Sequence, residues 1–364
     1  MFNIEKPTLL LNKQQCLANI RYMSEKAQRN YLEFRPHFKT HQSAEIGEWF
    51  RGFGVNKITV SSVTMAEYFA ANNWTDITIA FPVNLREINS INYLAKSITL
   101  NLLVESVETV EFLNSNLDNK VNLFIKIDTG NNRTGVDSKN FNLISKIISK
   151  IDSAEKILFK GFLSHAGHTY KAISPEQIGA FHRQQISSLK NLKKLFRNAS
   201  EEIILSIGDT PACTLEDYFE DIDEIRPGNF VFYDVMQYEL SVCDTGVIAV
   251  CLACPVVAVH KNRQEIVVYG GAVHLSKETI TDGFDRKYYG LVVKLNKGRW
   301  DMPLKDCYVK ALSQEHGIIK MGEKEIQNIN PGDIIGVLPI HSCLTANLMK
   351  QYLTLENEII TMMR

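Results

Sequence analysis

Residues 121–164 read VNLFIKIDTGNNRTGVDSKNFNLISKIISKIDSAEKILFKGFLS, and this stretch contains one complete strand–helix–strand unit. The apolar runs 121–127 and 157–164 have the length and composition of buried β-strands. Between them, residues 141–151 carry apolar side chains at helical spacing. Buried strands joined by a helix run parallel in one sheet, so this stretch predicts an α/β fold.

The same alternation continues on both sides of this unit. Apolar side chains at helical spacing predict a first helix that ends near Arg29. Further strand-like runs lie at 32–38, 57–61, 77–81, 98–104, 203–207 and 224–232. Together with the two strands above they make about eight strand–helix units, the number that closes a TIM-type (β/α)8 barrel. We therefore predict this barrel for residues 13–235.

The pattern changes after residue 235. Strand-like runs follow one another with turn residues between them, at 247–259, 265–269, 290–295, 307–312, 317–321 and 333–338. Few helix-like segments separate these runs, which favours a smaller and mostly antiparallel β domain. Residues 1–12 are also extended, and we assign them to this C-terminal domain together with residues 236–364.

Composition and charge favour a small-molecule substrate. The chain has 364 residues, with 40 basic against 41 acidic side chains and a formal net charge of −1. This balance gives no electrostatic reason to expect nucleic acid or an anionic membrane as partner. The N-terminus lacks the basic and apolar regions of a signal peptide, and no apolar run is long enough to span a bilayer.

The cysteines indicate a reducing, cytoplasmic location. Their number is seven, and they are widely scattered, which does not suit a disulfide framework. Cys251 and Cys254 match a redox or zinc motif on paper. They lie inside a strand-like apolar run, and the sequence has no second Cys-x-x-Cys motif to complete a metal site. We therefore predict two buried structural thiols.

Polar residues at the carboxyl ends of the barrel strands are the candidates for chemistry, because active sites of such barrels lie there. The first strand ends in RPHFKTH (35–41). Lys39 would be partly desolvated at the end of a buried strand, which favours a neutral amine and Schiff-base chemistry. The alternative is a lysine at the rim of the barrel, in water.

The fifth and sixth strands end in longer polar segments. The turn KIDTGNNRTG (126–135) carries Arg133, which could donate to an oxyanion or a ring oxygen or could be a solvated surface arginine. The loop SHAGHTY (164–170) has side chains that suit proton transfer or phosphate contact, although a core histidine is the simpler interpretation. These side chains are His165, His168 and Tyr170.

The seventh and eighth strands end in SIGDTP (206–211) and EIRPGN (224–229). Backbone amides at such glycine turns can approach a phosphate closely, and a threonine hydroxyl can add to them. An ordinary glycine turn is the alternative for each. Phosphate sites after the last two strands recur in these barrels, which favours a phosphate site here. Its candidate residues are Gly208, Thr210, Gly228 and Asn229.

A separate candidate lies in PIHSC (339–343). In a strand, residues two apart point the same way about 7 Å apart, so His341 and Cys343 could hold one metal ion with modest bending. Imidazole and thiolate suit zinc, and two protein ligands would leave positions open for water or substrate. A buried cysteine beside an unrelated histidine is the alternative.

Taken in order, these segments resemble the D-threonine aldolase and D-serine dehydratase family. This family belongs to the alanine-racemase-like, fold type III enzymes that use pyridoxal 5′-phosphate (PLP). The resemblance covers nearly the whole chain and includes YGGAVHLSK (269–277) and QEHG (314–317). It implies an N-terminal barrel, a C-terminal β domain, PLP as cofactor and a homodimer.

The resemblance also implies roles for single residues. Lys39 looks like the lysine that carries PLP, Arg133 matches the arginine near the cofactor ring, and His165 matches the ring-side histidine. Residues that fall where the family surrounds the phosphate are Tyr170, Gly208, Thr210, Gly228 and Asn229. His341 and Cys343 match the pair that binds a divalent metal.

For the reaction, the resemblance implies elimination of water from a D-configured β-hydroxy amino acid, giving a 2-oxo acid and ammonia. Family members with aldolase activity often carry Asp at the second metal position, whereas Cys343 looks more like the zinc-dependent D-serine dehydratase or the related 3-hydroxyaspartate dehydratase. The alternatives are retro-aldol cleavage with His168 as base, then racemisation, then PLP binding without catalysis. In this family a basic residue is common at the position of Gln42, and an acidic residue is common at the position of Gln314. These two departures leave the identity of the substrate open.

Overall fold

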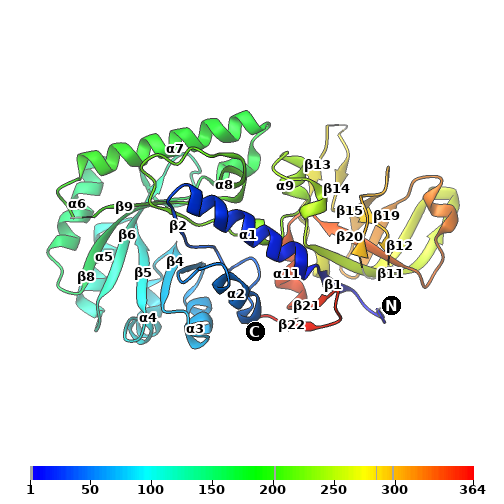
Figure 1. Cartoon of the computed structure of the whole chain (residues 1–364), viewed down its shortest axis with the longest axis horizontal. Helices are drawn as coiled ribbons and strands as arrows, with labels where there is room; N and C mark the ends of the chain where they lie inside the picture. The colour runs from blue at the N-terminus through cyan, green and yellow to red at the C-terminus, as the bar shows by residue number, and fades with distance from the viewer. Residues whose placement is uncertain (1–2, 201, 284, 297–298) are drawn as a thin grey trace. The chain divides into compact units, whose positions relative to one another are not determined.

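The computed structural model describes residues 3–200, 202–283, 285–296 and 299–364. The chain forms two compact units (Figure 1). The barrel unit comprises Tyr22–Lys39 and Gly47–Gly228. The sheet unit comprises the chain up to Arg21, Thr40–Ile46 and Asn229–Arg364. The predicted domain ranges, 13–235 for the barrel and 1–12 plus 236–364 for the β domain, stay predictions.

Eight parallel strands form the barrel unit, in the order β2-β10-β9-β8-β6-β5-β4-β3. Their bounds are β2 (Glu33–Phe34), β3 (Ile58–Val60), β4 (Asp76–Pro82), β5 (Thr99–Val104), β6 (Val121–Asp128), β8 (Ile157–Ser164), β9 (Ile204–Ile207) and β10 (Glu224–Ile225). The short β7 (Val136–Asp137) pairs with β6. A parallel bridge between His37 and Thr59 joins the first and last strands of this order. The TIM-type barrel is therefore confirmed.

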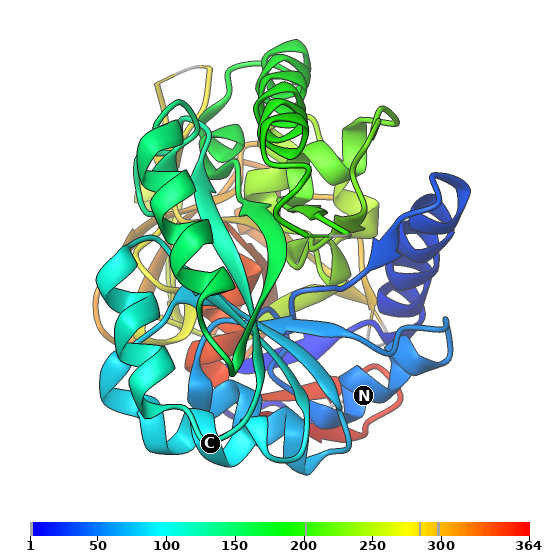
Figure 2. The same cartoon turned by 90° about the vertical axis from the view of Figure 1, so that its left-hand side faces the viewer.

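Helices lie outside these strands (Figures 1 and 2). They are α1 (Lys13–Arg29), α2 (Ala44–Arg51), α3 (Val63–Ala71), α4 (Ile88–Ala95), α5 (Val107–Asn116), α6 (Phe141–Asp152), α7 (Pro175–Leu195) and α8 (Thr210–Leu215). Helix α6 illustrates why they form. Asn140 caps its first turn by accepting from Leu143 N, and Ile144, Ile147 and Ile151 bury one face.

One strand prediction is wrong in part. Residues 224–232 were expected to be extended, but the strand ends at Ile225 and a 3₁₀ helix, η3, spans Asn229–Val231. Pro227 explains the difference, because it has no N–H with which to continue the ladder. The apolar side chains of Phe230 and Val231 are buried, so their hydrophobicity reflects burial and not a strand.

The sheet unit contains strands in the order β12-β19-β18-β15-β20-β11-β1-β21-β22, and β11 also pairs with β12. Their bounds are β1 (Thr8–Leu11), β11 (Val250–His260), β12 (Glu265–Tyr269), β15 (Gly290–Val293), β18 (Tyr308–Leu312), β19 (His316–Lys320), β20 (Ile334–Pro339), β21 (Gln351–Thr354) and β22 (Ile359–Thr361). The pairing of β11 with β12 closes six of them into an antiparallel β-barrel. The mostly antiparallel C-terminal domain is therefore confirmed.

Short elements accompany this sheet. They are helices α9 (Val235–Glu239), α10 (Ala272–Leu275) and α11 (Ser342–Met349), and strands β13 (Ile280–Thr281), β14 (Lys287–Tyr288), β16 (Leu295–Asn296) and β17 (Arg299–Trp300). Cys251 and Cys254 are free, buried thiols on β11, as predicted. Among the described helices, none combines the length and the apolar content that a bilayer crossing needs.

Candidate active site

Lys39 lies in a turn that directly follows the bridge between His37 and Thr59. Its backbone N–H donates to His37 Nδ1 at 3.4 Å. The Lys39 side chain is exposed, so the expectation of partial desolvation is wrong for this structure. The physical reason is that Lys39 follows the last paired residue of the strand and therefore lies outside the enclosed ladder.

His165 follows β8 and is held by the end of β9. Its Nδ1 is 2.5 Å from the carbonyl oxygen of Gly208. A carbonyl can only accept, so Nδ1 carries the proton. Burial, and then the positive charge of Lys39, hold the pKa of His165 well below its usual value. His165 is therefore a neutral imidazole in electrostatic reach of Lys39.

Lys126 on β6 is a site residue that the sequence analysis missed. It is 5% exposed, and its Nζ donates to the carbonyl oxygen of Ile127 at 3.2 Å. Burial, followed by the charges of Arg226 and Arg133, lowers the pKa of Lys126 to about 7. A lysine in an otherwise apolar strand run was the signal that could have revealed it.

Arg133 lies on an ordered turn although its own side chain is exposed. Asp128 Oδ1 accepts hydrogen bonds from the backbone N–H groups of Gly130 and Asn131, both at 2.9 Å. Gly135 closes the turn with φ +112°, where an added Cβ would lie 2.8 Å from Asp128 N. Only glycine fits this position, which fixes the shape of the turn. The charge of Arg133 contributes to the lowered pKa of both His165 and Lys126.

The candidate phosphate residues at the ends of β8 and β9 lie together. Tyr170 Oη accepts from the backbone N–H of Thr210 at 3.2 Å. Asp209 caps α8 by accepting from Ala212 N at 2.8 Å, which fixes the start of that helix. A Cβ on Gly208 would lie 2.7 Å from the carbonyl carbon of Arg226, so this close approach requires glycine. Gly228 is buried after β10.

His168 lies elsewhere on the same rim. It belongs to the 3₁₀ helix η2 (Gly167–Lys171). Its ring packs edge-on against Phe181, with the two ring centroids 4.4 Å apart. A Cβ on Gly130 would be 3.6 Å from His168 Cε1, so the ring lies beside the turn after β6. Burial lowers the pKa of His168 although the charge of Asp128 opposes this shift.

The metal candidates His341 and Cys343 lie in the sheet unit. The sequence argument placed them on one strand, which is wrong: His341 precedes α11 and Cys343 lies in its first turn. Their side chains nevertheless hydrogen bond to each other. Burial lowers the pKa of His341, but this bond and the charges of Cys343, Asp234 and Glu278 outweigh it and raise the pKa to about 9.

Two further side chains of the sheet unit contact Cys343. Its sulfur is 3.3 Å from Thr40 Oγ1 and 3.7 Å from Asn229 Nδ2. The sequence analysis expected Asn229 beside the cofactor phosphate, but its amide points to this network. Within the described ranges there is no group of three or more His, Cys, Asp or Glu side chains that could hold a metal ion, so His341 and Cys343 form a pair.

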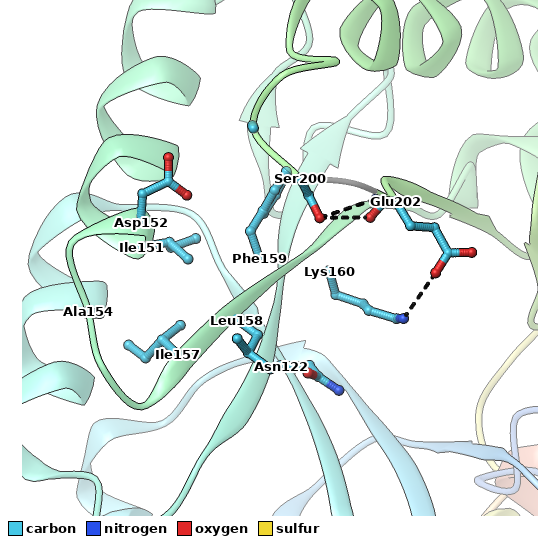
Figure 3. A pocket seen from close by; sticks show the side chains of 11 residues that line it. Asn122, Ile151, Asp152, Ala154, Ile157, Leu158, Phe159, Lys160, Ser200 and Glu202 are labelled. Atoms are coloured by element: carbon cyan, nitrogen blue, oxygen red, sulfur yellow. Dashed lines mark hydrogen bonds and ion pairs between the residues drawn. The ribbon is translucent and has the colours of Figure 1, made fainter.

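A pocket of about 510 Å³ lies at the opposite end of the barrel strands (Figure 3). Residues from the start of β6 and of β8 line it, among them Asn122, Ile157 and Leu158. Lys160 Nζ and Glu202 Oε2 approach to 4.0 Å at its edge. Catalytic residues of such barrels lie at the carboxyl ends of the strands, so this pocket is not a candidate active site.

Two family models match the chain. The model of the alanine racemase N-terminal domain matches residues 11–235, and that of a serine dehydratase domain matches residues 249–355. The D-serine dehydratase of Dictyostelium discoideum is 29% identical over 385 residues, covering 98% of this chain and 94% of that protein. The 3-hydroxy-D-aspartate aldolase of Paracoccus denitrificans is 24% identical over 370 residues, covering 97% of this chain and 89% of that protein.

Solved structures give the same fold. That of D-threo-3-hydroxyaspartate dehydratase from Delftia sp. HT23 superposes with a TM-score of 0.91 and 23% identity, covering 100% of this chain and 98% of the other. A likeness at this identity supports the architecture of both units. The similar proteins include dehydratases and an aldolase.

Proposed function

Because the chain belongs to the alanine racemase N-terminal domain family and continues in a serine dehydratase-like domain, we propose that it is a PLP-dependent lyase. The proposed reaction eliminates water from a D-configured β-hydroxy amino acid to give a 2-oxo acid and ammonia. The observation that carries the proposal is that Lys39, Lys126 and Arg133 lie at or after the ends of barrel strands and that their charges all reach His165.

The residues of this cluster fit an anionic cofactor. Lys39 and Arg133 supply positive charge, which favours a phosphate-bearing ligand. Tyr170 and Thr210 both carry hydroxyl groups, and the hydrogen bond from the Thr210 backbone N–H to Tyr170 Oη keeps the two residues together. Lys39 is the proposed attachment point, since its exposed amine can be reached by a carbonyl compound.

His341 and Cys343 fit a divalent metal, and we propose zinc. A nitrogen and a sulfur already within hydrogen-bond distance can become ligands of one ion. Two protein ligands leave coordination positions for water or substrate, which suits a catalytic metal better than a structural one. Bound there, the metal would supply a Lewis acid for the β-hydroxyl group of the substrate.

The chain's own residues then have distinct tasks. Bound PLP supplies an electron sink for the charge that develops at the substrate Cα. Lys39 Nζ would hold PLP, and as a free amine it would take the Cα proton of the substrate. His165 stays neutral and keeps its ring orientation through Gly208, so it packs in the site without adding a charge. Tyr170, Gly208, Thr210, Gly228 and the backbone at Asn229 are proposed to surround the phosphate.

Elimination is preferred to retro-aldol cleavage because the second metal candidate is Cys343 and not an aspartate. Retro-aldol cleavage needs a base for the β-hydroxyl proton. The described contacts of His168, with Phe181 and beside Gly130, do not join it to Lys39. The homodimer and the cytoplasmic location are proposed with the function.

Product analysis tests the proposal. The protein loaded with PLP and zinc is incubated with D-serine, D-threonine and D-threo-3-hydroxyaspartate, with and without a chelator. We expect ammonia and a 2-oxo acid from at least one substrate, and loss of turnover with the chelator. Glycine and an aldehyde would show retro-aldol cleavage instead. PLP binding without any product would indicate a non-catalytic binding protein.

A further inference from the structure

Asn229 lies against the sulfur of Cys343 inside the sheet unit. Its Nδ2 is 2.6 Å from Asp234 Oδ2, 3.0 Å from Ser342 Oγ and 3.7 Å from Cys343 Sγ. Asn229 is 6% exposed, so water does not compete for these amide protons. Because only an N–H can donate to the Asp234 carboxylate, the amide orientation is determined.

Asp234 holds both this amide and the start of the helix that carries Cys343. Its Oδ2 accepts from Ser342 N at 3.0 Å and from Ser342 Oγ at 3.3 Å, in addition to Asn229. Its Oδ1 accepts from Gln237 N at 3.1 Å and caps α9. Asp234 is 1% exposed. One buried carboxylate therefore fixes Asn229 and the backbone beside Cys343 together.

The position of the Asn229 amide also carries a free-energy cost. Its Oδ1 is buried and has no hydrogen-bond partner among the described residues. A buried acceptor left without a partner costs about 1–3 kcal/mol. Packing alone would favour an apolar side chain of the same size. A need for the donor on Nδ2 explains why an amide occupies this position.

We propose that Asn229 and Asp234 are positioning residues of the metal site, with Asn229 donating a hydrogen bond to the Cys343 sulfur. The inference rests on the proposed function, because it requires a divalent metal at His341 and Cys343. A donor to the sulfur keeps the side chain of this metal ligand in one orientation. The side chain of Asn229 thus serves the metal and not the cofactor phosphate.

The test replaces Asn229 by a side chain of similar size without a donor, Asn229→Leu. Loss of a hydrogen bond to a metal ligand typically weakens metal affinity at least about 10-fold. We expect this loss for zinc, measured on PLP-loaded protein by competition with a chromophoric chelator. In cobalt-substituted protein, the thiolate-to-cobalt absorption band is expected to shift. Bound PLP, followed by its visible absorbance, is expected to stay.

Asn19→Leu is the matched control. Asn19 is also in the sheet unit and 4% exposed, and its Nδ2 donates to the carbonyl oxygens of Val231 at 3.2 Å and Val247 at 3.0 Å. This variant removes a comparable buried amide for which the described residues show no contact with Cys343. It is expected to lose stability while zinc affinity and the cobalt band stay at wild-type values.

Other results would overturn the inference in distinguishable ways. Unchanged zinc affinity and cobalt band in Asn229→Leu would overturn it and leave the proposed function standing. Loss of PLP with normal zinc affinity would overturn it in favour of a phosphate contact. Wild-type protein that binds no stoichiometric zinc would overturn both the inference and the metal part of the function. If Asn229→Leu does not fold, Asp234→Asn serves instead, with the same expected and contrary results.

Discussion

The two candidate sites are built in opposite ways. The cluster around Lys39 collects side chains from the ends of several strands of the barrel unit, and Lys39 and Arg133 are exposed. The pair His341 and Cys343 is two residues apart in sequence and is supported by buried polar side chains of the sheet unit. The first site therefore depends on closure of a whole barrel, whereas the second depends on one short segment and its anchors. Substitutions in one site should therefore leave the other site intact.

The largest effect is expected at Lys39. Lys39→Ala removes the proposed attachment point and the base for the Cα proton, so turnover should fall by roughly 10²–10⁴-fold, as for loss of an acid–base group. The measurement is product formation from the best substrate, together with zinc content. Zinc content should stay at its wild-type value, because the metal pair lies in the sheet unit. Normal turnover in this variant would contradict the proposed mechanism.

Cys343→Ala should break the other site alone. Removing one of two metal ligands is expected to lower zinc occupancy and to reduce turnover about 100-fold, the scale of a Lewis acid worth a few kcal/mol. Zinc analysis and product formation measure the two effects. PLP should remain bound, which its visible absorbance reports. Full activity in metal-free wild-type protein would rule out the metal role.

Glu224→Gln tests how much a buried ion pair of the barrel interior contributes to the stability of the barrel. Glu224 is 3% exposed and accepts from Arg35 Nε at 2.5 Å and from Ser206 Oγ at 2.6 Å. Arg35 also pairs with Asp76 at 2.6 Å, so Glu224→Gln leaves the arginine one of its two carboxylate partners. Breaking a buried ion pair outright costs about 3–5 kcal/mol, so we expect a clear fall of the denaturation midpoint that corresponds to less than this cost. The exposed pair of Lys150 and Glu111 provides the control. Glu111→Gln should cost less than about 1 kcal/mol, and an equal loss would contradict the argument.

Lys126→Met should have the smallest effect and the opposite sign. The pKa of Lys126 is lowered to about 7 from an unfolded value of 10.5, so the folded state loses this proton first as pH rises. Between these values the unfolded state binds more protons, and stability therefore rises with pH. The cost of the buried charge is greatest below pH 7.

The methionine variant should remove this slope and stabilise the protein at pH 7 by about 1–4 kcal/mol. Urea denaturation at several pH values, compared between variant and wild type, measures the difference. An unchanged slope would show that Lys126 titrates normally in the folded protein.

The sequence predicted the barrel because the strand and helix periods alternate without long interruptions, as residues 121–164 show. It also predicted that Lys39, Arg133 and His165 follow strands, as they do, whereas their roles stay predictions. It could not predict that His165 is neutral, since this depends on the Gly208 carbonyl at the end of another strand. Nor could it predict the place of the Asn229 side chain, because its partners Asp234 and Ser342 meet only after folding.

The bridge between His37 and Thr59 has a consequence for local stability. Only two backbone hydrogen bonds are described there, from Phe38 N to Thr59 O and from Thr59 N to Pro36 O. By contrast, seven residue pairs join β6 to β8. Opening costs least where the ladder is thinnest, so amide hydrogens along this seam should exchange with solvent before those of the central strands. The turn that carries Lys39 begins at this seam, so the lysine is attached to an edge of the barrel that we expect to open before the central strands.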